Sequence, residues 1–265
     1  MKTAWVEFKN IDIFYEKNKI IQDLNLKLLL GEHTVIIGEN GSGKSTLVKA
    51  ITKLKYPRAS KYSYIKHFGN RKINIWSLRQ RIGFVLSEID TRIKSNMLSS
   101  DVIISGYQGT FGLVNNQNIS KDCLSQLENI KELLDLKNIS KYYSELSDGQ
   151  KRRTLIARSI INKPEVLILD EPTSMLDLKA RYQLLDVLGK LTKEGMTLLY
   201  ITNNIDNIIK ETKRVIFIKN GKIVLDGNPL DVINSENISR LYNYDLNVSN
   251  VEGCWRICPN QTLHH

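Results

Sequence analysis

The sequence of 265 residues predicts an α/β fold with a mainly parallel sheet flanked by helices. Short apolar runs typical of buried strands alternate with longer stretches of helical apolar spacing, an order that favours parallel strands joined by crossover helices. Two further patterns modify this core. Strict alternation near the N-terminus predicts an antiparallel β subdomain, and a continuous helical pattern in the middle predicts an α-helical subdomain.

The first half contains the elements expected around a ligand site. Ala4–Phe14 and Ile21–Leu28 alternate like half-buried strands. The β-branched run Thr34–Ile37 ends at a glycine-rich turn and is followed by a helix-forming stretch, Lys44–Thr52. Arg81–Val85 has the composition of another strand. These elements predict a strand–loop–helix unit beside an antiparallel patch.

The second half begins with helical spacing over residues 87–161, shown by Leu124, Leu127, Ile130 and Leu134. After it, strands and a helix alternate, and the chain then forms a hairpin around Asn220-Gly221, a strong signal for a two-residue turn. The elements predicted here are Val166–Leu169, a helix over residues 180–191, Thr197–Ile201, Arg214–Ile218 and Lys222–Asp226.

The predicted organisation has four parts. Residues 1–86 form the first half of the core with the antiparallel β subdomain, and residues 87–161 form the helical subdomain. Residues 162–235 form the second half of the core, and residues 236–265 form a short C-terminal tail.

Composition excludes several classes of protein. Hydrophobic residues make up 42% and charged residues 25%, as in an ordinary globular protein, and no apolar run is long enough for a membrane span. No apolar segment for export follows the first residues, so we expect a cytoplasmic protein. Three cysteines do not make a disulfide framework, and the spacing of Cys254 and Cys258 is not that of a usual zinc site.

The net charge of +10 leaves one alternative open. Residues 53–81 contain nine Lys or Arg, no acidic residue and several aromatic residues, a combination that could face nucleic acid. The plainer interpretation is a solvated basic face in a chain rich in Lys, Asn and Ile. We therefore do not expect nucleic acid as a partner, and anionic membrane headgroups are a further candidate.

A phosphate-binding loop is the strongest motif in the chain. Gly38-Glu-Asn-Gly-Ser-Gly-Lys44-Ser45 fits the P-loop pattern and lies between a predicted strand and a predicted helix, as that motif requires. Successive N–H groups of the loop and of the helix N-terminus would surround phosphates. Lys44 would reach the β- and γ-phosphates, and the Ser45 hydroxyl would bind Mg²⁺. The fold class is accordingly a P-loop NTPase core.

A second motif places two carboxylates at the end of a buried strand. Asp170 and Glu171 directly follow Val166–Leu169, at the edge where α/β sheets bind ligands. Asp170 would hold Mg²⁺ through water, and Glu171 would orient and polarise the attacking water.

Further motifs resemble the ATP-binding subunits of ABC transporters over about Val6–Ile233. Leu146-Ser-Asp-Gly-Gln150 is similar to the family's signature, with Asp148 where glycine is usual, and Ser174-Met-Leu-Asp177 is similar to its D-loop. Tyr15, 23 residues before Gly38, matches the aromatic residue that stacks on adenine. The stretch from Ser105 to Leu113 and the short tail are similar to the metal-chelate and oxyanion importer branch.

The resemblance implies a head-to-tail dimer, either a homodimer or a heterodimer, in which Ser147 and Gly149 of one copy close over ATP held by the other. Taken alone, Ser147 is a plain helix cap. The resemblance and the motifs together assign catalysis to Lys44, Glu171 and Asn203 and Mg²⁺ binding to Ser45 and Asp170. The residues assigned to ATP binding are Tyr15, Gly38, Glu39, Asn40, Gly41, Ser42, Gly43, Lys44, Ser45, Thr46, Ser147, Gly149 and Gln150.

Two positions depart from the family. Ser87 stands where the glutamine loop has Gln, and Asn203 stands where the switch histidine is usual. Serine is too short to reach Mg²⁺ and water as glutamine does, and asparagine cannot carry a proton or a charge. Either these are tolerated substitutions, or the site hydrolyses ATP slowly.

Three functions remain as candidates. The first is the subunit that energises a membrane transporter, with an importer favoured over an exporter and with a separate transmembrane permease. It would lie peripherally on the inner face of the cell membrane. The second is a soluble ABC ATPase that acts on nucleic acid or ribosomes. The third is a regulatory ATP-binding module with slow turnover.

Overall fold

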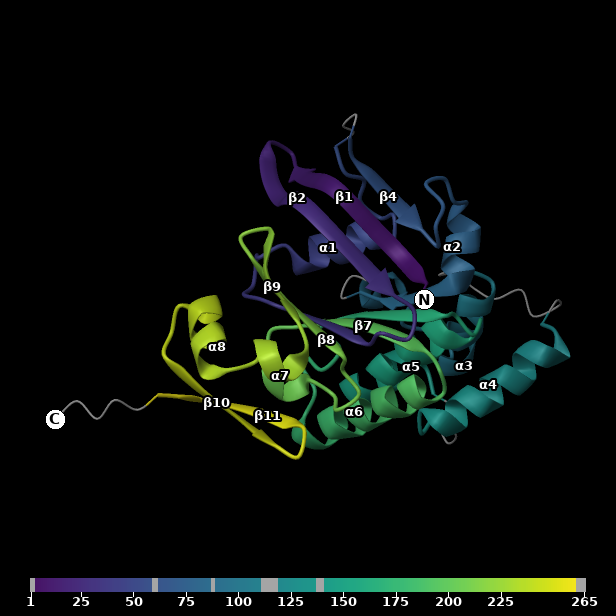
Figure 1. Ribbon diagram of the computed structural model, residues 1–265. Helices are drawn as coiled ribbons and strands as arrows, with labels where there is room; N and C mark the ends of the chain where they lie inside the picture. The colour runs from purple at the N-terminus through teal and green to yellow at the C-terminus, as the bar shows by residue number, and fades with distance from the viewer. Residues whose placement is uncertain (1–2, 59–61, 87–88, 111–118, 137–140, 261–265) are drawn as a thin grey trace. The chain divides into compact units, whose positions relative to one another are not determined.

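The computed structural model describes residues 3–58, 62–86, 89–110, 119–136 and 141–260 (Figure 1). The chain divides into two compact units. Unit 1 consists of residues 1–75 and 197–265, and unit 2 of residues 76–196. The predicted α/β class with a mainly parallel sheet is confirmed: β3 pairs in parallel with β7 and β8, and β5 pairs in parallel with β6.

The antiparallel β subdomain belongs to unit 1. Its strands are β1 (Ala4–Tyr15), β2 (Asn18–Leu29) and β4 (Tyr64–His67), in the order β2-β1-β4. The alternation in the sequence determines its buried face, because Leu24, Leu26 and Leu28 are all buried. The strand β4 was not predicted. It has only four residues, and it pairs with Val6–Lys9 of β1.

The second sheet of unit 1 carries the phosphate-binding loop. Its order is β7-β3-β8-β9, with β9 antiparallel to β8, and the apolar residues of its central strands are buried. The bounds are β3 (Thr34–Ile37), β7 (Thr197–Thr202), β8 (Arg214–Lys219) and β9 (Lys222–Gly227), and the helix α1 (Lys44–Ile51) follows β3. The β8–β9 hairpin turns at Asn220-Gly221, as predicted.

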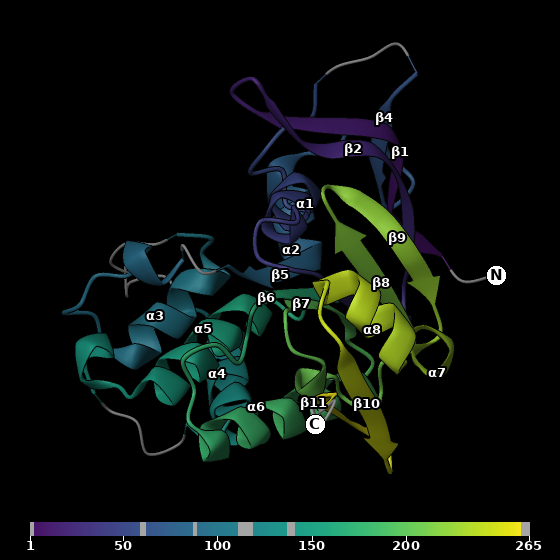
Figure 2. The same cartoon turned by 90° about the vertical axis from the view of Figure 1, so that its left-hand side faces the viewer.

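The C-terminal segment, Pro229 to Pro259, also belongs to unit 1, and its part beyond residue 235 has more structure than the predicted short tail. It contains α7 (Pro229–Val232), α8 (Ser235–Tyr242), β10 (Leu246–Val251) and β11 (Cys254–Pro259). The side chain of Asn234 caps α8, and β10 and β11 form an antiparallel pair (Figure 2). Trp255 of β11 is buried, whereas Cys254 and Cys258 are exposed free thiols.

Unit 2 contains the parallel pair β5 (Ile82–Val85) and β6 (Val166–Asp170). Its helices α3 (Ser99–Tyr107), α4 (Lys121–Leu133) and α5 (Asp148–Ile160) lie within residues 87–161, the predicted helical subdomain, whereas α2 (Ile75–Arg81) and α6 (Leu178–Lys193) lie outside that range. Helices α3 and α5 pack closely, since a Cβ on Gly106 would lie 2.1 Å from the Arg158 carbonyl oxygen. The Arg158 guanidinium is buried there and donates to Ser105 Oγ and the Thr110 carbonyl; burial lowers its pKa to about 10.

Among the helices that the structure describes, none combines the length and the apolar composition that crossing a bilayer requires.

Candidate functional site

The loop between β3 and α1 has a backbone that glycine makes possible. A Cβ on Gly38 would lie 2.2 Å from the Ile218 carbonyl oxygen, and Gly43 has φ of 105° at the N-cap of α1. A Cβ on Gly43 would also lie 2.7 Å from Ile21 Cδ1. The loop therefore passes too close to the β8 backbone for any side chain at Gly38, and the left-handed φ of Gly43 would strain any other residue there.

The same loop presents donors that suit an anion. Lys44 is buried, and its Nζ donates to the carbonyl oxygens of Gly38 at 2.7 Å and Glu39 at 2.9 Å. Helix α1 has no side-chain cap and no acidic residue in its first turn, so no carboxylate of that turn competes for its N–H groups. Within the described residues, the buried Ser42 Oγ has no hydrogen-bond partner. A buried cation, an uncapped helix N-terminus and an unpartnered hydroxyl together fit the phosphates of a nucleotide.

Neighbouring strands brace the loop. The Gly221 N–H donates to the Ser42 carbonyl at 2.9 Å, and the Gln22 N–H donates to the Gly221 carbonyl at 3.0 Å. A Cβ on Gly221 would lie 2.0 Å from the Ile20 carbonyl oxygen, so the β8–β9 turn also requires glycine. This turn and the start of β2 thus hold the loop, whose Asn40, Gly41 and Ser45 are exposed while Thr46 is buried.

Tyr15 lies at the end of β1, on the hairpin whose second strand contacts Gly43. Its side chain is 42% exposed, and Lys55 Nζ lies 4.1 Å from the centroid of its ring. Beside it is a cavity of about 460 Å³, lined by Phe14, Glu16, Lys17, Lys55, Tyr56, Pro57 and Arg58. An exposed ring next to a cavity is compatible with base stacking.

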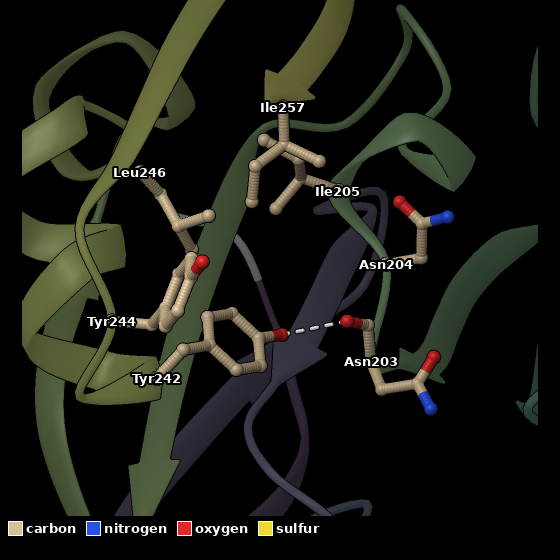
Figure 3. Close-up of a pocket in the computed structure, with 7 residues that line it drawn as sticks. All are labelled: Asn203, Asn204, Ile205, Tyr242, Tyr244, Leu246 and Ile257. Atoms are coloured by element: carbon tan, nitrogen blue, oxygen red, sulfur yellow. Dashed lines mark hydrogen bonds between the residues drawn. The ribbon is translucent and has the colours of Figure 1, made fainter. Parts of the chain in front are cut away.

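Asn203 follows β7 and is exposed. Its backbone carbonyl accepts a hydrogen bond of 2.6 Å from the Tyr242 hydroxyl, and its side-chain amide points away from that tyrosine (Figure 3). Both residues line a cavity of about 410 Å³ together with Asn204, Ile205, Tyr244, Leu246 and Ile257. Sequence reasoning missed Tyr242, because nothing local links it to residue 203.

In unit 2, the two carboxylates occupy different environments. Asp170 is buried at the end of β6, and Glu171 is half-buried with a left-handed φ of 47°. Non-glycine residues adopt this conformation rarely, and it is common at functional sites. The Glu171 carbonyl accepts hydrogen bonds from Arg152 Nη2 at 2.8 Å and Ser174 Oγ at 2.9 Å. Arg152, on the signature helix α5, is a second contact that sequence reasoning missed.

The signature segment begins α5. Ser147 Oγ accepts from the Gln150 N–H at 3.3 Å, and Gln150 Oε1 accepts from the Ser147 N–H at 3.0 Å, which makes a capping box. A Cβ on Gly149 would meet the Ala180 Cβ of α6 at 3.0 Å. The plain helix cap is therefore present, and a further role of Ser147 toward phosphate stays a prediction.

The predicted site residues divide between the two units. Unit 1 holds the phosphate-binding loop, Tyr15 and Asn203, whereas unit 2 holds Asp170, Glu171 and the signature segment. The position of the glutamine loop, Ser87, lies outside the described residues.

Comparison with known proteins adds independent support. The model of the ABC transporter family matches residues 21–174. A putative ABC transporter ATP-binding protein of Streptococcus mutans is 31% identical over 94% of this chain and 96% of its own length. The glutamine transport ATP-binding protein GlnQ of Escherichia coli is 32% identical over 92% of this chain and 100% of its own.

Solved structures show the same fold. A putative metal-chelate type ABC transporter in an inward-facing conformation superposes with a TM-score of 0.78, at 21% identity and over 98% of both chains. An ATP-binding cassette solved as a dimer in a post-hydrolysis state, bound to ADP and Pi, superposes with a TM-score of 0.70, at 24% identity, over 84% of this chain and 98% of its own. On the matched family model and these relatives, the chain belongs to the ABC transporter family, as an ATP-binding subunit with the P-loop NTPase fold.

Proposed function

We propose that this subunit binds and hydrolyses ATP to energise a membrane importer, and that two nucleotide-binding subunits close head to tail over the nucleotide. The observation that carries the proposal is the phosphate-binding loop. It combines the buried Lys44 ammonium, the uncapped N-terminus of α1 and the unpartnered Ser42 hydroxyl.

Each unit contributes different chemistry to the proposed reaction. Lys44 and the loop N–H groups hold the β- and γ-phosphates, and the exposed ring of Tyr15 stacks on the base. Ser45 and Asp170 would hold Mg²⁺, which when bound neutralises charge on the phosphates. Glu171 orients and polarises the attacking water, and Asn203 contacts the γ-phosphate through its amide.

Ser147 of the signature segment can bind nucleotide held by a second copy of the chain while it still caps α5. Ser147 Oγ accepts a bond from the Gln150 N–H, and a hydroxyl can donate its own proton at the same time. It can therefore cap α5 and donate to a γ-phosphate held by the partner. The N-terminus of α5 adds a favourable partial positive charge.

Exposed apolar residues next to the D-loop support an interface. Met175 is 92% exposed, and Leu178 and Tyr182, one turn apart on α6, are 66% and 39% exposed. Large apolar side chains exposed close together are typical of protein–protein contact surfaces. A structural neighbour is described as a dimer, which supports the association of two copies.

The names of two relatives support a role in import. A relative from Lactobacillus johnsonii is named as a methionine import ATP-binding protein, and the name of GlnQ assigns that relative to glutamine transport. We propose that a transmembrane permease subunit is the partner of this chain and that it holds the protein at the inner face of the membrane.

The departures from the family favour slow basal hydrolysis. Asn203 offers an amide where the family has an imidazole, and Ser87 replaces glutamine. Positioning supplies most of phosphoryl-transfer catalysis, so looser contacts lower the rate more than the affinity.

A role on nucleic acid has less support. Several cations of the basic stretch lie over aromatic rings of the same chain: Arg58 over Phe14 at 5.5 Å, and Lys66 and Arg71 over Tyr64 at 4.8 Å and 4.5 Å. These cations and rings already contact one another within the chain, and they are the groups that nucleic acid would need to bind.

The test is ATP-dependent thermal stabilisation and ATP turnover of Lys44→Ala. At ATP one hundred times above Kd, binding stabilises the folded protein by about 2.7 kcal/mol, and the variant should lose this shift and its turnover. Lys49→Ala removes another cation from the same helix and should behave as the wild type. An unchanged ATP affinity in Lys44→Ala would show that this loop does not bind the nucleotide.

A further inference from the structure

The C-terminal segment is bonded directly to the switch position. The Tyr242 hydroxyl, at the last residue of α8, donates to the Asn203 carbonyl at 2.6 Å, across 39 residues of sequence (Figure 3). The ring of Tyr242 forms a wall of the cavity that the two residues share. This contact is short and joins elements that no local pattern relates.

The position of Tyr242 is fixed by its own element. Ile238 and Leu241 of α8 are buried, and Asn243, with φ of 49°, ends the helix. Asn243 Oδ1 accepts from Lys219 Nζ at 2.7 Å. The start of β10 is held as well, because Ser239 Oγ accepts from the Leu246 N–H at 2.9 Å. The hydroxyl of Tyr242 is thus presented from a braced helix end.

Asn203 is fixed on its other side by the end of β7. Thr202 is buried, and its Oγ1 accepts from the Asn204 N–H at 3.1 Å and from Asn207 Nδ2 at 3.3 Å. The Asn203 backbone therefore lies between Thr202 and Tyr242. Its side chain has no such contact with Tyr242 and points away from it (Figure 3).

The consequence concerns the direction of the Asn203 amide. Asparagine is shorter than histidine and has no ring to pack, so its direction depends largely on the orientation of its backbone. The Tyr242 bond fixes the carbonyl of that backbone and so restricts where the side chain can point. We infer that Tyr242 is a positioning residue, which orients Asn203 toward the γ-phosphate without touching the nucleotide. This inference rests on the proposed function.

The direct test is ATP hydrolysis by the full chain carrying Tyr242→Phe, which removes the hydroxyl and keeps the ring. We expect kcat to fall about three- to ten-fold while the Kd for ATP changes less than about two-fold, because only positioning in the transition state is lost. Tyr244→Phe removes a hydroxyl from the same cavity without removing the bond to Asn203, and should leave both constants unchanged.

Repeating the Tyr242→Phe substitution in an Asn203→Ala variant distinguishes a positioning role of Tyr242 from a structural role. In Asn203→Ala, the carbonyl that Tyr242 bonds is retained, but the amide that it orients is gone. Tyr242→Phe should then lower kcat no further, whereas a general loosening of the fold would lower it equally in both backgrounds.

Two outcomes distinguish a failure of the positioning inference from a failure of the proposed function. If Asn203→Ala lowers kcat and Tyr242→Phe does not, the positioning inference is overturned and the proposed function stands. If the wild type neither binds nor hydrolyses ATP, the proposed function fails, and the inference fails with it.

Discussion

Replacing Tyr15 by alanine tests where the base binds. The ring is 42% exposed at the end of β1, so its removal takes little from the core and should lower the free energy of unfolding by less than about 1 kcal/mol. The effect should instead appear in nucleotide affinity, because stacking of a base on an aromatic ring contributes about 1–3 kcal/mol.

The contact with Lys55 lowers the expected contribution of stacking to nucleotide affinity. Its ammonium lies 4.1 Å from the ring centroid, and an exposed cation–π contact contributes about 0.5–1 kcal/mol. If the base takes this face of the ring, it must displace Lys55, and the net gain from stacking becomes about 0–2.5 kcal/mol, centred on about 1.3 kcal/mol. We therefore expect Tyr15→Ala to raise the Kd for ATP by about nine-fold.

The assay is titration calorimetry with ATP and with GTP. Both affinities should weaken to a similar extent, since every base offers a π-face, and Tyr15→Phe should stay within about two-fold of the wild type. Tyr56→Ala, at an exposed tyrosine that lines the neighbouring cavity, is the matched control. Unchanged affinity in Tyr15→Ala together with weakened affinity in Tyr56→Ala would show that the base binds in that cavity instead.

Three further predictions concern rate, pH and assembly. Asn203→His should raise kcat several-fold with little change in the Kd for ATP, and unchanged turnover in a folded variant would mean that the site is built around asparagine. His67 is buried and donates from Nε2 to the Ile51 carbonyl at 2.7 Å; burial holds its pKa below the ordinary 6.5, so the unfolded chain binds more protons as pH falls. The free energy of unfolding should therefore decrease below pH 6.5, by at most about 1.4 kcal/mol per pH unit for this group, and His67→Gln should flatten the dependence. Met175→Asp, at a residue that is 92% exposed, should leave ATP binding intact and weaken dimerisation in a Glu171→Gln background, as sedimentation velocity would show.

The sequence predicted those parts of the fold in which a local pattern determines the backbone conformation. The phosphate-binding loop could be predicted because the backbone requires its glycines, at Gly38 through the close Ile218 carbonyl and at Gly43 through a left-handed φ of 105°. The Asn220-Gly221 turn was readable because a two-residue hairpin needs positive φ at both positions, and the two residues have φ of 50° and 74°.

The missed elements have weaker local signals. The strand β4 has four residues inside a basic stretch, and its pairing with β1 is a tertiary contact. In the C-terminal segment, the Asn234 cap before α8 and the alternation around Trp255 are local signals of structure, where the prediction was only a short tail over residues 236–265.

The contacts that complete the site could not be predicted from pattern at all. Tyr242 reaches the carbonyl of Asn203, and Arg152 reaches the carbonyl of Glu171. In each bond the acceptor is a backbone carbonyl oxygen. Every residue type has this group, so the sequence does not indicate which residue accepts the bond. Sequence reasoning identified the side chains expected to act, and the structure adds the groups that hold their backbones.

The central claim is tested most directly by the mass in solution of Glu171→Gln with and without Mg-ATP. The substitution removes the carboxylate that polarises water and keeps the phosphate contacts, so ATP should bind without being consumed. Light scattering after size-exclusion should give the 30.4 kDa chain mass without nucleotide and about twice that mass with Mg-ATP. Adding Lys44→Ala should abolish the dimer. A Glu171→Gln protein that binds ATP and still has the mass of one chain would contradict the head-to-tail dimer and the account built on it.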